Sequence, residues 1–251
     1  MIQSLMIAFS MYSKIPMPRV EWNEKNMKYS MCFFPLVGLV LGAICYAVAT
    51  LLYRGELTSL SIASIMTVLP IAVTGGIHVD GLLDTIDALH SYGDREKKLA
   101  ILKDPHTGAF AIIGACCYFI LNLGVWSEMP KEALPVIAIS YVLTRALSGF
   151  SIVTFPLAKS SGLAATFQDM SQKMKVRITM LIYIFLCFGA MLLIDVSLGL
   201  TTFVIAAGVF LYYYGICRKH FGGITGDLAG YFLQVCELAI LIGVAIVSRI
   251  A

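Results

Sequence analysis

Charged residues are scarce in this chain. Only 13% of its 251 residues are Asp, Glu, Lys or Arg, whereas 59% are hydrophobic. Soluble domains average about 25% charged and about 45–50% apolar residues. The few polar side chains cannot cover a water-facing globule of this length, so the excess apolar surface must face lipid. The composition excludes an ordinary soluble protein and predicts an integral membrane protein, and no nucleic-acid partner is expected.

The seven cysteines lack the spacing of a metal site or a disulfide framework. No two of them form a CxxC motif, and all but Cys217 lie within apolar runs. A free cysteine in such a run packs as a small hydrophobic residue. We therefore expect neither structural zinc nor disulfide bonds.

The N-terminus lacks the features of a cleaved signal peptide. No basic residue precedes its apolar stretch, residues 4–12, and no small-residue cleavage site follows it. The stretch is also too short to span a bilayer. We expect an interfacial or re-entrant helix that ends before Pro16 and Pro18.

About seven apolar runs reach or approach the length of a membrane-spanning helix, which is about 20 residues. They are residues 31–53, 59–77, 107–126, 133–154, 178–195, 196–215 and 228–248. Gly38 and Gly42 favour close packing of the first run, and a tight hairpin is expected at residues 195–199. The predicted fold is all-α: one membrane-embedded bundle over residues 1–251, with about seven transmembrane helices and the short N-terminal helix.

The basic residues are distributed asymmetrically over the predicted connections. With seven crossings, 14 of the 18 lysines and arginines fall on one side of the membrane. The other four are Arg54, Lys131, Arg145 and Arg249. Because positive loops stay in the cytoplasm, we place the N-terminus there and the C-terminus outside. The two long connections, residues 78–106 and 155–177, are cytoplasmic in this topology. We therefore expect a plasma-membrane (inner-membrane) protein whose active site is on the cytoplasmic side.

Three aspartates follow the second apolar run at helical spacing. Asp80, Asp84 and Asp87 are placed at i, i+4 and i+7, so a helix projects them from one face. Neighbouring carboxylates raise one another's pKa unless a cation neutralises them. Magnesium is commonly held by a few carboxylates together with substrate phosphates. The pattern predicts a magnesium site; the alternative is a solvated acidic helix face, although no basic residue interrupts the segment between His78 and His90.

Two further segments carry polar residues at the same predicted boundary. Lys103, Asp104 and Thr107 lie at the start of the third long run, where helix N-terminal amides and Lys103 could bind a phosphate. The alternative there is a plain helix cap made by Asp104 and Thr107. Before the last run, the turn that contains Gly222, Gly223 and Thr225 would let the backbone approach a ligand closely, and Asp227 could join the metal site. The turn's residues are Gly222, Gly223, Ile224, Thr225, Gly226 and Asp227.

Two charges lie within predicted membrane helices. Arg145 and Glu237 are each nine residues from the inner ends of their runs, or about 13 Å deep at 1.5 Å per residue. We predict that they form an ion pair, because isolated charges are costly in a membrane. The pair could brace the bundle, or Arg145 could reach a substrate phosphate.

Residues 75–89, GGIHVDGLLDTIDAL, resemble the signature of the adenosylcobinamide-GDP ribazoletransferase (cobalamin synthase) family. Lys103-Asp104 with Gly108, residues 222–227 followed by Glu237, residues 15–18 and residues 34–38 resemble the family as well. The resemblance extends over nearly the whole chain. In two places the chain departs from the family pattern: Pro105-His106 stands where Ser-Arg is common, and Lys159 stands where arginine is common. No arginine role is therefore carried over, and Lys159 keeps the charge without a bidentate phosphate grip.

The resemblance implies an enzyme that joins adenosylcobinamide-GDP to alpha-ribazole, or to its 5'-phosphate, and releases GMP. Phosphoryl transfer depends mainly on positioning and charge neutralisation. We expect the catalytic residues to be Asp87, His78 and Asp84, with Asp87 or His78 as the general base. The expected magnesium ligands are Asp80, Asp84, Asp87 and Asp227. The expected substrate-binding residues are Lys103, Asp104, Lys159, Arg145, Gly222, Gly223 and Thr225.

Two other functions fit parts of the sequence. A CDP-alcohol phosphotransferase also carries spaced aspartates at a membrane boundary, but its pattern needs an Ala-Arg pair after Asp-Gly that this chain lacks. A cation-coupled transporter would suit Arg145 and Glu237, but transporters usually hold their coupling carboxylates near the midplane. Besides the lipid bilayer, a second copy of the chain or other corrinoid-pathway enzymes are open as partners.

Overall fold

The apolar runs form long helices in the computed structural model, which describes residues 1–55 and 57–250. Seven long helices make up the bundle: α3 (Phe34–Arg54), α4 (Ser59–Thr74), α7 (Ala109–Ser127), α8 (Leu134–Thr154), α10 (Lys173–Ile194), α11 (Val196–Ile216) and α12 (Gly226–Ile250). Shorter helices connect them: α1 (Ile2–Tyr12), α2 (Glu24–Met27), α5 (Ile77–His90), α6 (Arg95–Ile101) and α9 (Leu163–Met170). Short 3-10 or π turns flank α3, α8 and α11: η1 (Ser30–Phe33), η2 (Lys131–Ala133) and η3 (Cys217–Phe221). The predicted all-α bundle is confirmed.

Six of these helices are long and apolar enough to cross a membrane on their own, by length and composition. They are α3, α7, α8, α10, α11 and α12. A seventh candidate is the pair α4 and α5, which is bent by 98° at the break between the two helices. The chain is therefore a multi-pass membrane protein, with six helices long enough to cross a membrane, or up to seven if the bent pair is one span.

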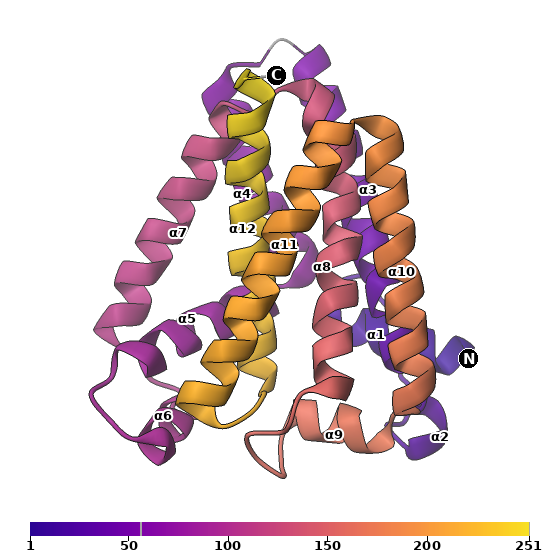
Figure 1. The fold of residues 1–251 in the computed structure, drawn as a ribbon, viewed down its shortest axis with the longest axis vertical. Coiled ribbons are helices and arrows are strands. Elements are labelled where there is room, and N and C mark those ends of the chain that lie inside the picture. Colours follow the sequence, from indigo (N-terminus) through magenta and orange to yellow (C-terminus); the bar gives the residue numbers. More distant parts are fainter. Residues whose placement is uncertain (56, 251) are drawn as a thin grey trace.

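The bend between α4 and α5 corrects the expected course of the second run. The predicted helix over residues 59–77 ends at Thr74, and Gly75 and Gly76 both take left-handed backbone conformations, with φ of 72° and 79°. Glycine adopts this conformation without the steric cost that other residues meet. As a result α5 turns away from the span and lies across one end of the bundle (Figure 1). The predicted loop over residues 78–106 is thus largely helical.

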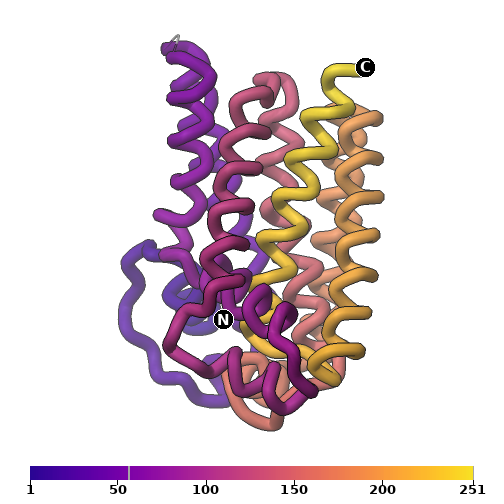
Figure 2. The backbone as a smooth tube through the Cα atoms, turned by 90° about the vertical axis from the view of Figure 1, so that its left-hand side faces the viewer, coloured from indigo at the N-terminus to yellow at the C-terminus, as the bar shows by residue number. Residues whose placement is uncertain are grey.

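All the long connections meet at one end of the bundle. Residues 75–108, 155–172 and 217–225 lie at the lower end in Figure 1, and the C-terminus lies at the opposite end. Figure 2 shows the same division from the side, with α5, α6 and α9 gathered around the lower ends of the long helices. α1 packs near this end, where Ala8 and Phe9 contact Val37 of α3. The segments that were expected to share one membrane face therefore do share one end of the molecule.

Close helix packing depends on the glycines of α3. A Cβ atom at Gly38 would lie 2.4 Å from the Tyr141 carbonyl oxygen, and one at Gly42 would lie 2.2 Å from that of Ala138. Only hydrogen atoms fit at these points, so α3 and α8 approach each other more closely than larger residues would allow. The predicted hairpin between α10 and α11 is also present. The Asp195 carboxylate caps α11 by accepting a hydrogen bond from the Leu198 amide at 2.8 Å.

The predicted pair of Arg145 and Glu237 is confirmed. Arg145, on α8, is 1% exposed, and its guanidinium forms a salt bridge with Glu237 on α12. Thr144 donates a hydrogen bond to the same carboxylate at 3.2 Å, and Arg145 also donates to the Tyr141 carbonyl at 3.3 Å. Gly38 makes room for the pair, because a Cβ there would lie 2.7 Å from Cδ of Arg145. The pair joins α8 to α12 in the middle of the bundle.

Replacing Glu237 with leucine should destabilise the protein strongly, because it leaves the Arg145 charge buried without a partner. We expect a loss of about 3–5 kcal/mol, seen as a lower apparent melting temperature in detergent. The double variant Arg145→Met/Glu237→Leu removes both charges and should recover most of that loss. A double variant as unstable as Glu237→Leu alone would contradict this account.

Candidate active site

α5 and α12 cross at unusually short distance beside the expected acidic site. A Cβ atom at Gly81 would lie 2.6 Å from the backbone oxygen of Asp227, and one at Gly230 would lie 3.1 Å from that of His78. The two helices can touch here because both positions lack side chains. The crossing brings the acidic face of α5 against the first turn of α12, which carries Asp227.

The charges of neighbouring aspartates act on Asp84, as the sequence predicted within α5. Partial burial, followed by the charges of Asp80, Asp227 and Asp87, raises the pKa of Asp84 to about 6. Asp80 is exposed, and the other three are partly buried. A carboxylate that loses water and gains like-charged neighbours resists ionisation. The site therefore concentrates negative charge that a cation would relieve.

The donor set fits a hydrated divalent cation. It contains carboxylate oxygens from two helices, which are the ligands that magnesium prefers. Within residues 1–55 and 57–250, no three side chains of His, Cys, Asp or Glu lie close enough together to hold one metal ion. Magnesium usually keeps several waters and takes one or two carboxylates together with substrate phosphates, so a complete protein cage is not required. Magnesium binding by Asp80, Asp84, Asp87 and Asp227 stays a prediction.

Asp87 lies against the start of α7. A Cβ atom at Gly108, the residue before that helix, would lie 2.1 Å from Oδ1 of Asp87, so only glycine leaves room for the carboxylate. The alternative of a helix cap made by Asp104 and Thr107 is wrong, because no side chain caps α7. Asp104 instead accepts hydrogen bonds from the backbone and the ring Nδ1 of His106, at 3.0 and 2.7 Å. Asp104 remains half exposed and lines neither of the two cavities that border the aspartates.

A basic pocket of about 210 Å³ borders the aspartates. Lys103 and Lys159 line it together with Thr225 and Asp227. The ammonium of Lys159 donates to the Leu99 carbonyl at 2.6 Å. Burial and the charge of Lys103 lower the pKa of Lys159, whereas the carboxylate of Asp227 acts in the opposite direction. The structure thus brings together the two lysines that were predicted to bind phosphate, which come from separate connections.

A short backbone bridge positions Lys159. The Ala158 amide donates to the Ile224 carbonyl at 3.0 Å, and the Ile224 amide donates to that of Pro156 at 2.8 Å. Gly223 packs against this strand-like contact, since a Cβ there would lie 2.4 Å from the Pro156 oxygen.

The side chain of Arg95 packs against the neighbouring turn at Gly222. Gly222 has a φ of 72°, and a Cβ atom there would lie 2.1 Å from the guanidinium carbon of Arg95. The Arg95 guanidinium donates a hydrogen bond to the Ala158 carbonyl at 3.1 Å. Gly222 and Gly223 therefore allow close approach by protein groups, and their role in substrate binding stays a prediction. Arg95 was missed because its mixed-charge segment has the pattern of an ordinary solvated helix.

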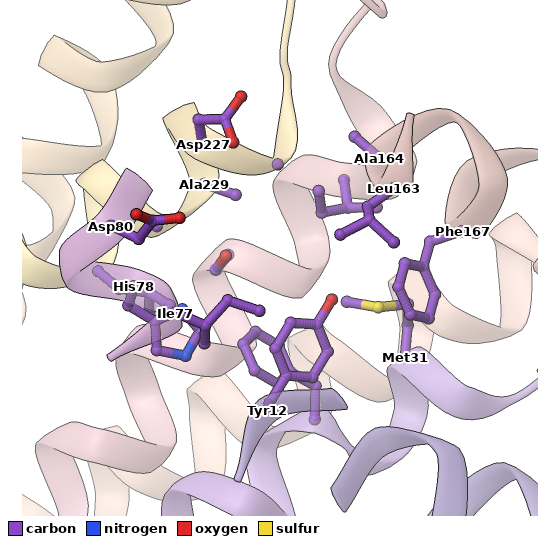
Figure 3. Close-up of a pocket in the computed structure, with 16 residues that line it drawn as sticks. Tyr12, Met31, Ile77, His78, Asp80, Leu163, Ala164, Phe167, Asp227 and Ala229 are labelled. Carbon is purple, nitrogen blue, oxygen red and sulfur yellow. The ribbon is translucent and has the colours of Figure 1, made fainter. Parts of the chain in front are cut away.

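A second cavity, of about 240 Å³ and largely apolar, lies beside the same aspartates. Figure 3 shows Asp80 and Asp227 on one side of it and Tyr12, Met31 and Phe167 on the other. No local sequence pattern marks Tyr12, Met31 and Phe167, because α1, η1 and α9 come together only in the folded bundle.

His78 also lines this cavity and is 4% exposed. Burial lowers the pKa of His78 to about 3, with a smaller effect from Arg145. Its ring nitrogen Nε2 is buried and has no hydrogen-bond partner among the described residues. The imidazole is therefore uncharged at neutral pH. Arg145 lines neither cavity, so its contacts fit the bracing role.

A model of the family described as cobalamin-5-phosphate synthase matches residues 4–245. The chain belongs to this family. It is similar to the adenosylcobinamide-GDP ribazoletransferase of Lachnoclostridium phytofermentans, with 46% identity that covers 98% of this chain and 94% of the relative. Proteins of the same name from Clostridium perfringens and Carboxydothermus hydrogenoformans are 30% and 28% identical, over 96% and 100% of this chain and 98% and 99% of their own lengths. No solved structure matches significantly.

Family membership confirms the resemblance carried by residues 75–89. The chain is an enzyme, an adenosylcobinamide-GDP ribazoletransferase by family, and it acts in cobalamin synthesis. Both the CDP-alcohol phosphotransferase and the transporter interpretations lose their support.

The raised pKa of Asp84 makes stability depend on pH. Between about pH 4, the ordinary range of Asp, and pH 6, the folded protein binds more protons than the unfolded chain. Its free energy of unfolding therefore falls as pH rises through this window. Asp84→Asn removes the titration and should raise the apparent melting temperature at pH 7 in EDTA. Because Asp84 is only half-buried, we expect a gain of about 1 kcal/mol, or about 2–4 °C.

That gain should shrink as the pH is lowered toward 4, where the wild-type carboxyl is protonated. Asp169→Asn, at an exposed carboxylate on α9, is the matched control and should melt like the wild type. A stability of Asp84→Asn at pH 7 equal to or below that of the wild type would contradict the electrostatic account.

Proposed function

We propose that the enzyme transfers adenosylcobinamide phosphate from adenosylcobinamide-GDP to alpha-ribazole or its 5'-phosphate. A hydroxyl oxygen of the ribazole sugar forms a bond to the phosphorus that carries the cobinamide, and the bond from that phosphorus to the bridging oxygen breaks. GMP leaves with the bridging oxygen and its electron pair, and the hydroxyl proton passes to a base. The product is adenosylcobalamin or its 5'-phosphate. With the phosphorylated acceptor, the nucleophile must be a hydroxyl other than the 5' one.

The observation that carries this proposal is the contact between an acidic site and a basic pocket. Asp227 belongs to both: its charge raises the pKa of Asp84, and its carboxylate lines the pocket of Lys103 and Lys159. A diphosphate substrate needs cationic groups along its oxygens and a way to neutralise charge at the breaking bond. The two lysines would bind the diphosphate directly, and Thr225, which donates to Asp227 at 3.3 Å, would keep that carboxylate oriented.

Magnesium is the proposed cofactor, held by Asp80, Asp84, Asp87 and Asp227. When bound, the ion would neutralise the diphosphate and stabilise the departing GMP. Asp87 or Asp84 would take the proton from the ribazole hydroxyl. A base acts best when its pKa is near the working pH, and burial lowers the pKa of His78 to about 3, so His78 is poorly suited to this role.

We place the enzyme in the plasma membrane with this site toward the cytoplasm. The proposal is supported by the distribution of basic residues: the segments that carry nearly all of them converge on the end of the bundle where the site lies. Both substrates carry polar groups, so they must reach the site from the water on that side of the membrane.

Release of GMP by the purified protein in lipid nanodiscs tests the reaction. Wild-type enzyme should require a divalent cation and lose turnover in EDTA, with either or both acceptors as substrate. Asp80→Asn and Asp227→Asn should each lower kcat about 100-fold or more. Lys159→Ala should raise KM for adenosylcobinamide-GDP by about tenfold or more, whereas Lys173→Ala, at an exposed lysine of α10, should not.

The same assay in sealed vesicles tests the orientation, since neither substrate crosses a bilayer. Inside-out vesicles should release GMP, and right-side-out vesicles should do so only after permeabilisation. Full activity in EDTA would refute the metal assignment, and activity in intact right-side-out vesicles alone would refute the orientation.

A further inference from the structure

The apolar cavity beside Asp80 and Asp227 has no role in the phosphate chemistry described so far. Its wall is rich in aromatic rings: Tyr12 lies 4.3 Å from Phe34 and 6.0 Å from Phe167, measured between ring centroids. A dry apolar cavity of about 150 Å³ is large enough to hold benzene. A cavity of about 240 Å³ can therefore hold a flat molecule of two fused rings, but not a corrinoid.

A polar atom within this apolar wall is left without a partner. Nε2 of His78 is buried and makes no hydrogen bond to the described residues. The ring of His78 stacks on that of Tyr12, with centroids 5.8 Å apart and an angle of 19° between the planes. A buried donor or acceptor without a partner costs free energy. A ligand that supplies one hydrogen-bonding atom at the edge of an aromatic ring would satisfy it.

The cavity is continuous in its lining with the basic pocket. Leu163, Ala164, Gly226 and Asp227 line both. A nucleotide-like molecule could therefore place an aromatic base in the apolar cavity while its sugar lies beside Asp80 and Asp227.

We propose that this cavity binds the aromatic base of alpha-ribazole, and that Nε2 of His78 donates a hydrogen bond to the free ring nitrogen of that base. The inference rests on the proposed function and assigns the acceptor to a subsite within it. The base is an uncharged pair of fused rings with one free acceptor nitrogen, which matches a largely apolar wall with one buried polar atom that lacks a partner among the described residues. His78 is then a positioning residue.

Filling the cavity tests the subsite without relying on turnover. Ala229 lines it from α12 and is buried, so Ala229→Leu should occupy part of the space. We expect the Kd of alpha-ribazole, measured by calorimetry with protein in nanodiscs, to rise about tenfold or more. Ala207→Leu makes the same change at an exposed position of α11 and should leave the Kd unchanged.

The hydrogen bond is tested by pairing a protein variant with an altered ligand. The wild type should bind alpha-ribazole about tenfold more tightly than an analogue in which CH replaces the free ring nitrogen. His78→Phe keeps a stacked ring but removes the donor, so it should bind the two ligands about equally. Unchanged preference in His78→Phe, or an unchanged Kd in folded Ala229→Leu, would overturn the subsite.

These outcomes are separable from failure of the reaction itself. If the wild type releases GMP but neither variant alters alpha-ribazole binding, the proposed function stands and the subsite is wrong. If the wild type binds alpha-ribazole as described but releases no GMP from adenosylcobinamide-GDP, the subsite stands as a base-binding cavity and the reaction is wrong.

Discussion

The arrangement of the site depends on the close crossing of α5 and α12. Gly81 and Gly230 remove the side chains that would hold the two helices apart, and the backbone of Asp227 fills the space beside Gly81. The crossing is possible only because α5 leaves the direction of α4 through a bend of 98° at Gly75 and Gly76. Without the bend, the acidic helix would continue along the membrane span and away from Asp227. Backbone geometry at four glycines thus places carboxylates from two distant segments beside one another.

This juxtaposition is electrostatically unfavourable on its own, and the surrounding structure has to support it. The raised pKa of Asp84 reflects that cost. The rigid bundle beneath the site supplies the support, with α3 packed closely on α8 and the buried pair of Arg145 and Glu237 joining α8 to α12. Groups held in unfavourable positions of this kind are typical of active sites, where substrate or a cation relieves the strain.

Much of the fold could be predicted from the sequence because its determinants are local. Apolar length identifies the spanning helices, and the cost of an isolated charge in a membrane predicts that Arg145 and Glu237 pair. The helical spacing of Asp80, Asp84 and Asp87 likewise predicts that they act together.

The rest depends on contacts between distant segments, for which one sequence carries no signal. Gly222 and Gly223 have the pattern of a ligand-binding turn, yet their space is taken by Arg95 and by the backbone at Pro156. Tyr12 and Phe167 have the pattern of ordinary apolar helix residues, yet they form one wall of a cavity next to the aspartates. The left-handed conformations at Gly75 and Gly76 could have been suspected from the Gly-Gly pair, but the direction of the resulting bend could not.

The most direct test of the account is divalent-cation binding to the purified protein, measured by manganese titration with electron paramagnetic resonance. Wild-type protein should bind the ion, and Asp227→Asn should weaken binding about tenfold or more. Gly81→Val keeps every carboxylate but forces α5 away from α12, so it should weaken binding as well while the helical content is retained. Manganese affinity equal to that of the wild type in both folded variants would contradict the claim that the crossing of these two helices builds the cation site.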